Sequence, residues 1–176
     1  MAKRQKTIIT CAVTGAIHTP TMSEALPYTY DDIASQAIAA AEAGASILHL
    51  HARDPQTGAP SVDPADFSPF LERIKQSTDA VVNISTGGSL TLSIQDRIKP
   101  AASFSAEMCS MNMGSMNFSF HPLAKRYDTW KYDWEKGHLE SSKDYVFKNT
   151  FSDIEEILRT GASFDARFEM ECYDVG

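Results

Sequence analysis

The stretch ILHLHARDPQTG, residues 47–58, joins a short apolar run to two histidines and then enters a Pro/Gly turn. A short apolar run bounded by turn residues is typical of a buried strand, so we predict a strand over 47–53. Residues two apart on a strand point to the same face, and His49 and His51 therefore project together. The pair indicates either a metal site or two structural histidines that hydrogen-bond each other.

Apolar strands alternate with amphipathic helices along the rest of the chain. Apolar and β-branched runs predict further strands at 7–13, 80–86, 106–112 and 168–175. Helical spacing of apolar residues predicts helices at 30–43, 63–77, 91–99 and 152–161. The N-terminal caps are expected at Asp63 and Ser152, and the helix stops at Gly44 and Gly161. Ser152 and Glu155 have the spacing of a capping box.

The polar residues indicate which architecture these βα units build. Nearly continuous apolar strands suit a parallel sheet, either doubly wound or closed into a barrel. Reactive side chains gather at the C-terminal strand ends: Thr14, His49, His51, Ser85, Thr86, Ser110, Asn112, Glu169 and Glu171. A barrel directs all of these to one mouth, whereas an open sheet spreads them along an edge. We therefore predict a TIM (β/α)₈ barrel, with 1–176 as a single domain covering about the first five βα units.

Two features of the chain qualify this barrel. A closed barrel takes about 250 residues, so we expect the natural gene product to be longer than 176 residues. Residues 121–149, between the fourth strand and the last helix, carry two Trp and three Tyr among many charges. We expect this stretch to lie over the barrel mouth or to form an oligomer contact.

Composition excludes several classes of protein. The chain is 43% hydrophobic and 22% charged, which is ordinary for a globular protein, and its net charge is −7. Nucleic acid is a poor partner because no basic run stands out, and no apolar stretch approaches the roughly 18 residues that span a membrane. We expect the basic N-terminus to lead into a strand and not to be a signal peptide. Three separated cysteines fit free thiols, so we expect a cytoplasmic protein.

The third and fourth strands end in groups that suit an anion. The segment NISTGGS offers hydroxyls and backbone N–H groups at Ser85, Thr86, Gly87 and Gly88. Such groups bind a carboxylate or phosphate, although a βα turn that needs glycine is the alternative. In SMNMGSMNF, Ser110 and Asn112 add further polar side chains, while the methionines are more typical of core filling.

A metal site at the histidines needs a further ligand. Catalytic zinc uses three protein ligands and one open position, and by position Glu169 and Glu171 are candidates for the third. These two carboxylates share a strand face and repel each other unless a cation or a proton intervenes. The alternative is that one of them pairs with Arg53 or Arg167.

Taken together, five segments resemble one known family. They are TCAVTGA, HLHARDPQTG, NISTGGS, EMCSMNMGSMNF and FEMECYDVG, and they span the whole chain. In this order and at this spacing they resemble the β-keto acid cleavage enzymes, whose type member is 3-keto-5-aminohexanoate cleavage enzyme. The resemblance implies a zinc-dependent TIM barrel, usually tetrameric. Such transferases condense a β-keto acid with acetyl-CoA to give acetoacetate and a new acyl-CoA.

The resemblance also implies roles for individual residues. It assigns zinc binding to His49 and His51, carboxylate binding to Ser85, Gly88 and Ser110, and a catalytic carboxylate to Glu171. Arg53, Thr86, Gly87, Asn112 and Glu169 are further candidates at the same mouth. The family's third zinc ligand, in an R-V-G-x-E-D segment with its catalytic Arg and Asp, has no counterpart in these 176 residues.

One position departs from the type member and bears on the substrate. The type member has a glutamate after TGA that meets the substrate amine, whereas this chain has Ile17. An apolar side chain cannot neutralise an ammonium group, so we predict a substrate with an aliphatic or carboxylate-bearing tail in contact with Ile17. A zinc-dependent barrel hydrolase and an inactive metal-binding fragment are the alternative functions, and a requirement for acetyl-CoA separates them from the transferase.

Overall fold

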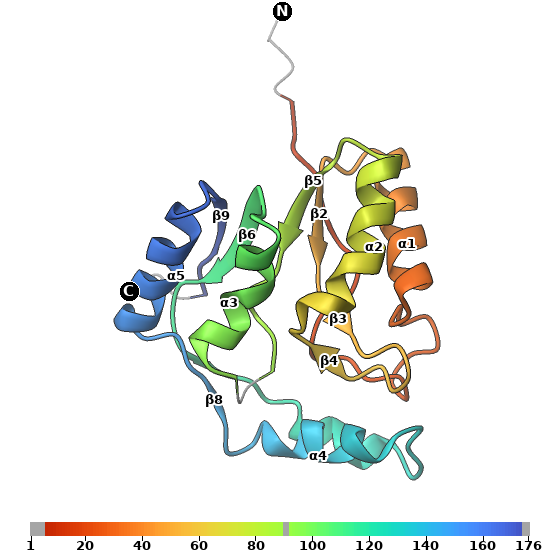
Figure 1. Cartoon of the computed structure of the whole chain (residues 1–176). Coiled ribbons are helices and arrows are strands. Elements are labelled where there is room, and N and C mark those ends of the chain that lie inside the picture. Colours follow the sequence, from red (N-terminus) through yellow and green to blue (C-terminus); the bar gives the residue numbers. More distant parts are fainter. Residues whose placement is uncertain (1–5, 90–91, 174–176) are drawn as a thin grey trace, which may run out of the picture.

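Five parallel strands form the central sheet of the computed structural model, which describes residues 6–89 and 92–173 (Figure 1). The strands are β1 (Thr10–Ala12), β2 (Ile47–Leu50), β5 (Val81–Ile84), β6 (Met108–Asn112) and β9 (Arg167–Glu171), and they lie side by side in that order. Each neighbouring pair is parallel, as the βα pattern predicts. The sheet is curled like half of a barrel, and β1 and β9 are its two edges.

Four helices pack on one face of the sheet: α1 (Tyr30–Glu42), α2 (Pro64–Ser77), α3 (Ile94–Ser103) and α5 (Phe151–Ala162). The core lies between the two layers, where Leu48 and Leu50 of β2 are fully buried among helical side chains. Because strand side chains alternate, His49 points to the opposite, inner face of the sheet. In the register of the sheet, His49 lies beside Asn83 of β5.

The second predicted strand is shorter than the sequence suggests. Only Ile47–Leu50 joins the main sheet, while Ala52–Arg53 (β3) turns away and pairs antiparallel with Pro60–Ser61 (β4). The prediction of one continuous strand over 47–53 is therefore wrong at its end. The first strand is likewise confined to Thr10–Ala12, and the last predicted strand extends into residues 174–175, which lie outside the described residues.

The helices are found where expected, with corrections at their ends. Helix α5 is capped by Thr150, which forms a capping box with Asp153, so the predicted cap at Ser152 is wrong by two residues. Gly161 lies inside α5 and does not end it. Helix α3 runs on to Ser103 through Pro100, beyond the predicted end at residue 99; the predicted start at residue 91 lies outside the described residues.

Residues 113–150, which we call the lid, cross the C-terminal edge of the sheet (Figure 1). The lid contains β7 (Met116–Asn117), the 3₁₀ helix η1 (His121–Arg126), α4 (Asp133–Ser141) and β8 (Val146–Phe147). Strands β7 and β8 pair antiparallel, so the lid leaves and re-enters the body at one place. Its position over the strand ends agrees with the sequence-based expectation for 121–149.

Polar contacts hold the lid to the loops that follow the first two strands of the sheet. The buried Glu135 carboxylate accepts hydrogen bonds from the backbone N–H and the hydroxyl of Thr21, at 2.8 and 2.9 Å. The Trp134 indole N–H donates to the backbone carbonyl of Thr57 at 3.1 Å. A cavity lies between the strand ends and the lid.

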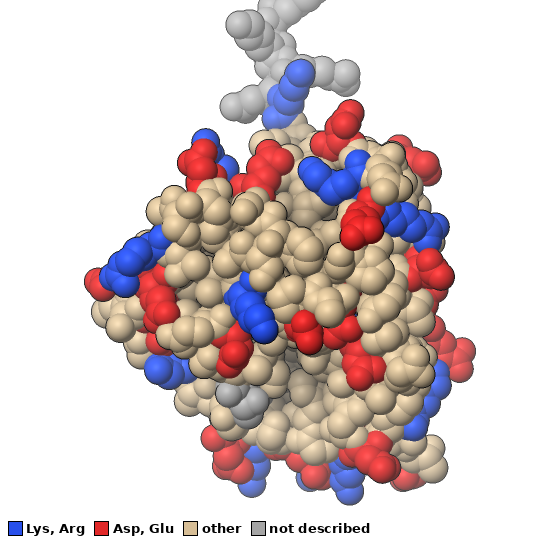
Figure 2. Space-filling view, in the orientation of Figure 1, with Lys and Arg blue, Asp and Glu red and all other residues tan. Residues whose placement is uncertain are grey.

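The surface of the described residues shows charges of both signs. Lys and Arg are interspersed with Asp and Glu over the face in Figure 2, which agrees with the absence of a basic run in the sequence. Among the described residues, no helix is both long enough and apolar enough to cross a membrane.

Candidate active site

The two histidines converge on the inner face of the sheet. His49 comes from β2 and His51 follows the strand, and their Nε2 atoms are 3.2 Å apart. Two nitrogens bound to one tetrahedral zinc at 2.0–2.1 Å would be separated by about 3.3 Å. The spacing therefore fits a shared metal ion, and it also fits a hydrogen bond between one protonated and one unprotonated nitrogen.

The other ring nitrogen of His49 faces a carboxylate. His49 Nδ1 is 3.0 Å from Glu169 Oε2, and the same oxygen accepts a hydrogen bond from Asn83 Nδ2 at 2.5 Å. Glu169 thus meets the side of the imidazole ring opposite to His51. It lies where it can orient His49, and not where it could share an ion held between the two Nε2 atoms.

A second way of holding a metal is geometrically available. Ligand atoms of His49, Glu169 and Glu171 all lie within 4.8 Å of one another. An ion there would use His49 Nδ1 and leave His51 without a role. We favour the Nε2 position, because it uses both converging imidazoles and leaves the Glu169 contact to orient one of them, as carboxylates commonly do for metal-binding histidines.

The protonation state of His51 favours metal binding. Burial lowers the pKa of His51 to about 3, and the electrostatic influence of His49 and Arg53 adds to this effect. At neutral pH the ring is uncharged, and a neutral imidazole has the lone pair that a metal requires.

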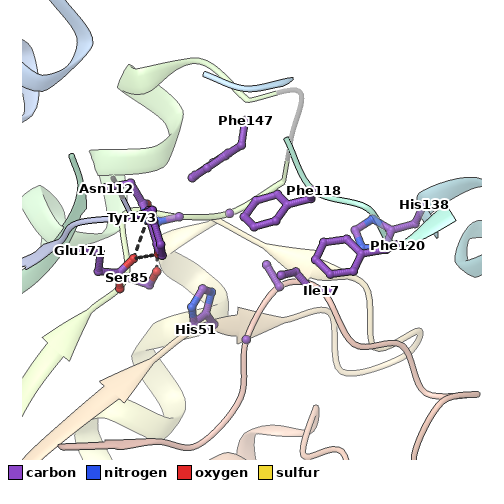
Figure 3. Close-up of a pocket in the computed structure, with 14 residues that line it drawn as sticks. Ile17, His51, Ser85, Asn112, Phe118, Phe120, His138, Phe147, Glu171 and Tyr173 are labelled. Carbon is purple, nitrogen blue, oxygen red and sulfur yellow. Dashed lines mark hydrogen bonds between the residues drawn. The ribbon is translucent and has the colours of Figure 1, made fainter. Parts of the chain in front are cut away.

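A cavity of about 170 Å³ opens beside His51 (Figure 3). Its lining residues come from the β1 loop, the ends of β2, β5, β6 and β9, and the lid. They are Gly15, Ala16, Ile17, His51, Ser85, Gly87, Gly88, Asn112, Phe118, Phe120, His138, Phe147, Glu171 and Tyr173. The predicted residues Ile17, His51, Ser85, Gly87, Gly88, Asn112 and Glu171 are thus brought together from five separate segments.

The polar end of the cavity contains a network around Glu171. Glu171 Oε2 accepts hydrogen bonds from Asn112 Nδ2 at 2.5 Å and from the Tyr173 hydroxyl at 2.7 Å. Burial and the hydrogen bond to Glu171 raise the pKa of Tyr173 to about 12, so the phenol stays protonated. Sequence reasoning missed Tyr173, although it follows Glu171 by two residues and falls within the strand predicted over 168–175; in the structure it lies just beyond the end of β9.

Ser85 is oriented by its neighbours. Its Oγ accepts from the Gly87 N–H at 3.0 Å and faces the Ser110 hydroxyl at 3.5 Å. Ser110 is itself 1% exposed and lies outside the cavity wall, behind Ser85. Thr86 also lies outside the wall, because its hydroxyl donates to the Ser110 backbone carbonyl at 2.7 Å.

Arg53 does not line the cavity, but it binds the loops that form its walls. The fully buried guanidinium donates to the Thr14 hydroxyl at 3.1 Å and to the backbone carbonyls of Gly58, His18 and Gly15. It therefore holds the loop that carries Ile17 and does not pair with Glu169 or Glu171. This placement follows from the turn after Leu50, which sequence reasoning missed.

The far end of the cavity is mostly apolar. Ile17, Phe118, Phe120 and Phe147 form its walls, and His138 of α4 is the polar member (Figure 3). Burial lowers the pKa of His138, against the effect of hydrogen bonding to the backbone of Ile17 and Ala16. The lid residues were not predicted, because their approach to the β1 loop depends on contacts between segments more than 100 residues apart.

Comparison with known proteins gives a consistent result for the whole chain. A family model described as beta-keto acid cleavage enzyme matches residues 6–176. A 3,5-dioxohexanoate:acetyl-CoA acetone transferase from Paraburkholderia graminis is 56% identical over 99% of this chain. A 3-dehydrocarnitine:acetyl-CoA trimethylamine transferase from Rhizobium meliloti is 30% identical over the full chain. The chain spans 56% and 58% of the lengths of these two relatives.

Solved structures of low sequence identity share the fold. The apo structure of ObcA superimposes with a TM-score of 0.58 at 18% identity, covering 84% of this chain and 30% of ObcA. A binary complex of ObcA with oxaloacetate gives a TM-score of 0.59. At this identity the likeness bears on the arrangement of strands and helices alone.

Proposed function

Because this chain belongs to the beta-keto acid cleavage enzyme family, we propose that it supplies the first five βα units of a TIM barrel that condenses a β-keto acid with acetyl-CoA. The products are acetoacetate and a new acyl-CoA. The observation that carries this proposal is the convergence of His49 and His51 beside a cavity that also contains Ser85, Gly88 and Glu171. The working protein is a cytoplasmic homotetramer, and residues 1–176 form a single domain of it.

The metal in this proposal is zinc, held by His49 and His51. Two neutral imidazole nitrogens 3.2 Å apart are a donor set that zinc accepts, with the remaining positions left for another ligand and the substrate. Zinc would supply Lewis-acid polarisation of the substrate keto oxygen. The third protein ligand and an acid/base partner for Glu171 are assigned to the later βα units of the proposed barrel.

The chain's own residues bind and orient the substrate carboxylate. Since Ser85 Oγ already accepts from the Gly87 N–H and faces the Ser110 hydroxyl, its proton is free to point at the ligand. The turn at Gly88, with φ of 90°, presents backbone to the cavity without a side chain. Together these groups anchor the carboxylate so that the keto carbon lies beside His51.

Glu171 is the carboxylate that takes part in proton transfer. Asn112 and Tyr173 both donate to its Oε2, which fixes the plane of the group and leaves Oε1 for the reacting molecules. The apolar end, with Ile17, Phe118 and Phe120, accepts the substrate tail. No carboxylate lines this end among the described residues, which supports a tail without a positive charge, and 3,5-dioxohexanoate is the first candidate.

The test is a complementation assay. The chain is coexpressed with the C-terminal remainder of the Paraburkholderia relative, loaded with zinc and given acetyl-CoA and a panel of β-keto acids. We expect acetoacetate to form, and to be lost with His51→Ala. Turnover of the keto acid without acetyl-CoA would support a hydrolase instead. Zinc binding with no turnover in any combination would support an inactive metal-binding fragment.

A further inference from the structure

Asn83 has no part in the proposed chemistry, yet its side chain reaches the histidine site. It is fully buried on β5 and lies beside His49 in the register of the sheet. Its Nδ2 donates to Glu169 Oε2 at 2.5 Å and lies 3.4 Å from His49 Nδ1. Its Oδ1 is buried and has no hydrogen-bond partner among the described residues.

The orientation of this amide follows from the carboxylate. Turning the Asn83 amide over would place Oδ1 against Glu169 Oε2, and two acceptors would then face each other without a proton. The observed orientation satisfies Glu169 and leaves Oδ1 unpaired. A buried unpaired carbonyl is unfavourable for folding, so an apolar side chain of similar shape would suit the interior better. The hydrogen bond of the Asn83 side chain to Glu169 is therefore made at the expense of stability.

The same argument determines where His49 carries its proton. Glu169 Oε2 lies 3.0 Å from His49 Nδ1, and an unprotonated Nδ1 would direct a lone pair at an anionic oxygen. Protonation of Nδ1 turns this contact into a charge-assisted hydrogen bond. In a neutral ring Nε2 then has the lone pair, and Nε2 is the atom that faces His51.

We propose that Asn83 is a positioning residue, which holds Glu169 against His49 and so keeps His49 in the Nδ1–H tautomer with Nε2 ready for a metal. The metal-binding half of this inference rests on the proposed zinc centre, but the tautomer does not. Glu169, which sequence reasoning considered as a third ligand, then acts through His49.

Three substitutions, with His51→Ala as a fourth in the zinc measurement, test the proposal in the 176-residue chain. Asn83→Leu removes the donor and the unpaired carbonyl together, and Glu169→Leu removes the acceptor. Asn112→Leu is the matched control, because it removes an amide–carboxylate hydrogen bond of the same 2.5 Å length from Glu171 and has no hydrogen bond to His49 among the described residues.

The first measurement is the tautomer of His49, from long-range ¹H–¹⁵N correlation spectra of histidine-labelled protein. We expect the Nδ1–H form in the unmodified chain and in Asn112→Leu. A mixture of the two tautomers is expected in Asn83→Leu and in Glu169→Leu. An Nε2–H form in the unmodified chain would overturn the proposal, whether or not the chain binds zinc.

The second measurement combines zinc affinity, by competition with a chromophoric chelator, and thermal unfolding. We expect zinc affinity about tenfold weaker in Asn83→Leu, with an unfolding temperature no lower than that of the unmodified chain. Unchanged zinc affinity in Asn83→Leu, or a parallel loss of stability, refutes a positioning role. Abolition of binding by Glu169→Leu but not by His51→Ala would place the ion at Nδ1 and refute it too. If the unmodified chain binds no zinc, the proposed centre fails, and the spectra still decide the tautomer.

Discussion

Gly161 tests whether the packing of α5 on β9 is as tight as the structure indicates. A Cβ at this position would lie 2.3 Å from Cζ and 2.9 Å from Cε1 of Phe168, well inside contact distance. Phe168 is one residue before Glu169, and its ring packs against the core, so it cannot move away freely. We therefore expect Gly161→Ala to force a shift of the ring or of the helix.

The size of the effect is a difference of two terms. Overpacking a core costs about 1–3 kcal/mol, whereas replacing glycine by alanine in a helix interior gains about 1 kcal/mol. At 2.3 Å the steric term should be near its upper limit, which leaves a net loss of about 1–2 kcal/mol. For a chain of 176 residues this lowers the melting temperature by roughly 3–6 °C.

The assay is thermal and urea unfolding followed by circular dichroism, with a double-mutant cycle. In a Phe168→Leu background the ring is absent, and Gly161→Ala should then be neutral or stabilising. If Gly161→Ala stabilises the unmodified chain, or if the cycle shows no coupling, the packing described here is wrong.

Three further predictions concern a turn, a histidine of the cavity wall and the substrate tail. Ser105 has φ of 46° after α3, so Ser105→Gly should raise the free energy of unfolding by about 0.5–1 kcal/mol in urea titrations; a loss of stability would contradict the assigned turn. His51 has its pKa lowered to about 3 in the folded chain, so the unfolded chain binds more protons between about pH 6.5 and pH 3. The contribution of His51 to the free energy of unfolding is therefore complete above about pH 6.5 and decreases as the pH falls through this window. In the metal-free chain, His51→Asn should lose less of its free energy of unfolding on acidification than the unmodified chain does. Identical pH profiles of stability for the two chains would show that the pKa of His51 is not lowered by folding. Ile17→Glu should shift the complemented enzyme toward β-keto acids with an ammonium tail, measured as a ratio of kcat/KM values; an unchanged ratio would mean that Ile17 does not contact the tail.

Local patterns were sufficient to predict the sheet and the histidine pair. Apolar runs placed all five strands of the sheet, and helical spacing of apolar residues placed the four helices that cover it. The two-residue repeat of a strand placed His49 and His51 on one face. The errors lie where two local signals compete. Ser152 with Glu155 and Thr150 with Asp153 both have the spacing of a capping box, and the structure uses Thr150 with Asp153.

Local sequence patterns do not predict contacts between segments that lie far apart in the sequence. The lid is held by hydrogen bonds between Glu135 and Thr21, which are 114 residues apart. Neither segment carries a sequence pattern that identifies the other as its partner. Carboxylate binding by Ser110 was an expectation from the family resemblance. In the structure the Ser110 hydroxyl lies behind Ser85, where it accepts a hydrogen bond from the Thr86 backbone N–H and faces Ser85 Oγ.

The two carboxylates of β9 show how the structure decides between readings that the sequence left open. Glu169 and Glu171 share a strand face, and pairing with Arg53 or Arg167 could have accounted for them. Arg53 instead donates to backbone carbonyls, and Arg167 pairs with Asp165. Among the described residues, neither Glu169 nor Glu171 pairs with a Lys or Arg side chain, and Glu169 lies 3.0 Å from His49 Nδ1. Neutral donors, Asn83 for one carboxylate and Asn112 with Tyr173 for the other, keep both ionised groups in place. Two like charges held side by side without a permanent cation favour a positive charge that arrives with the ligands, and a metal ion bound by the adjacent imidazoles meets that requirement.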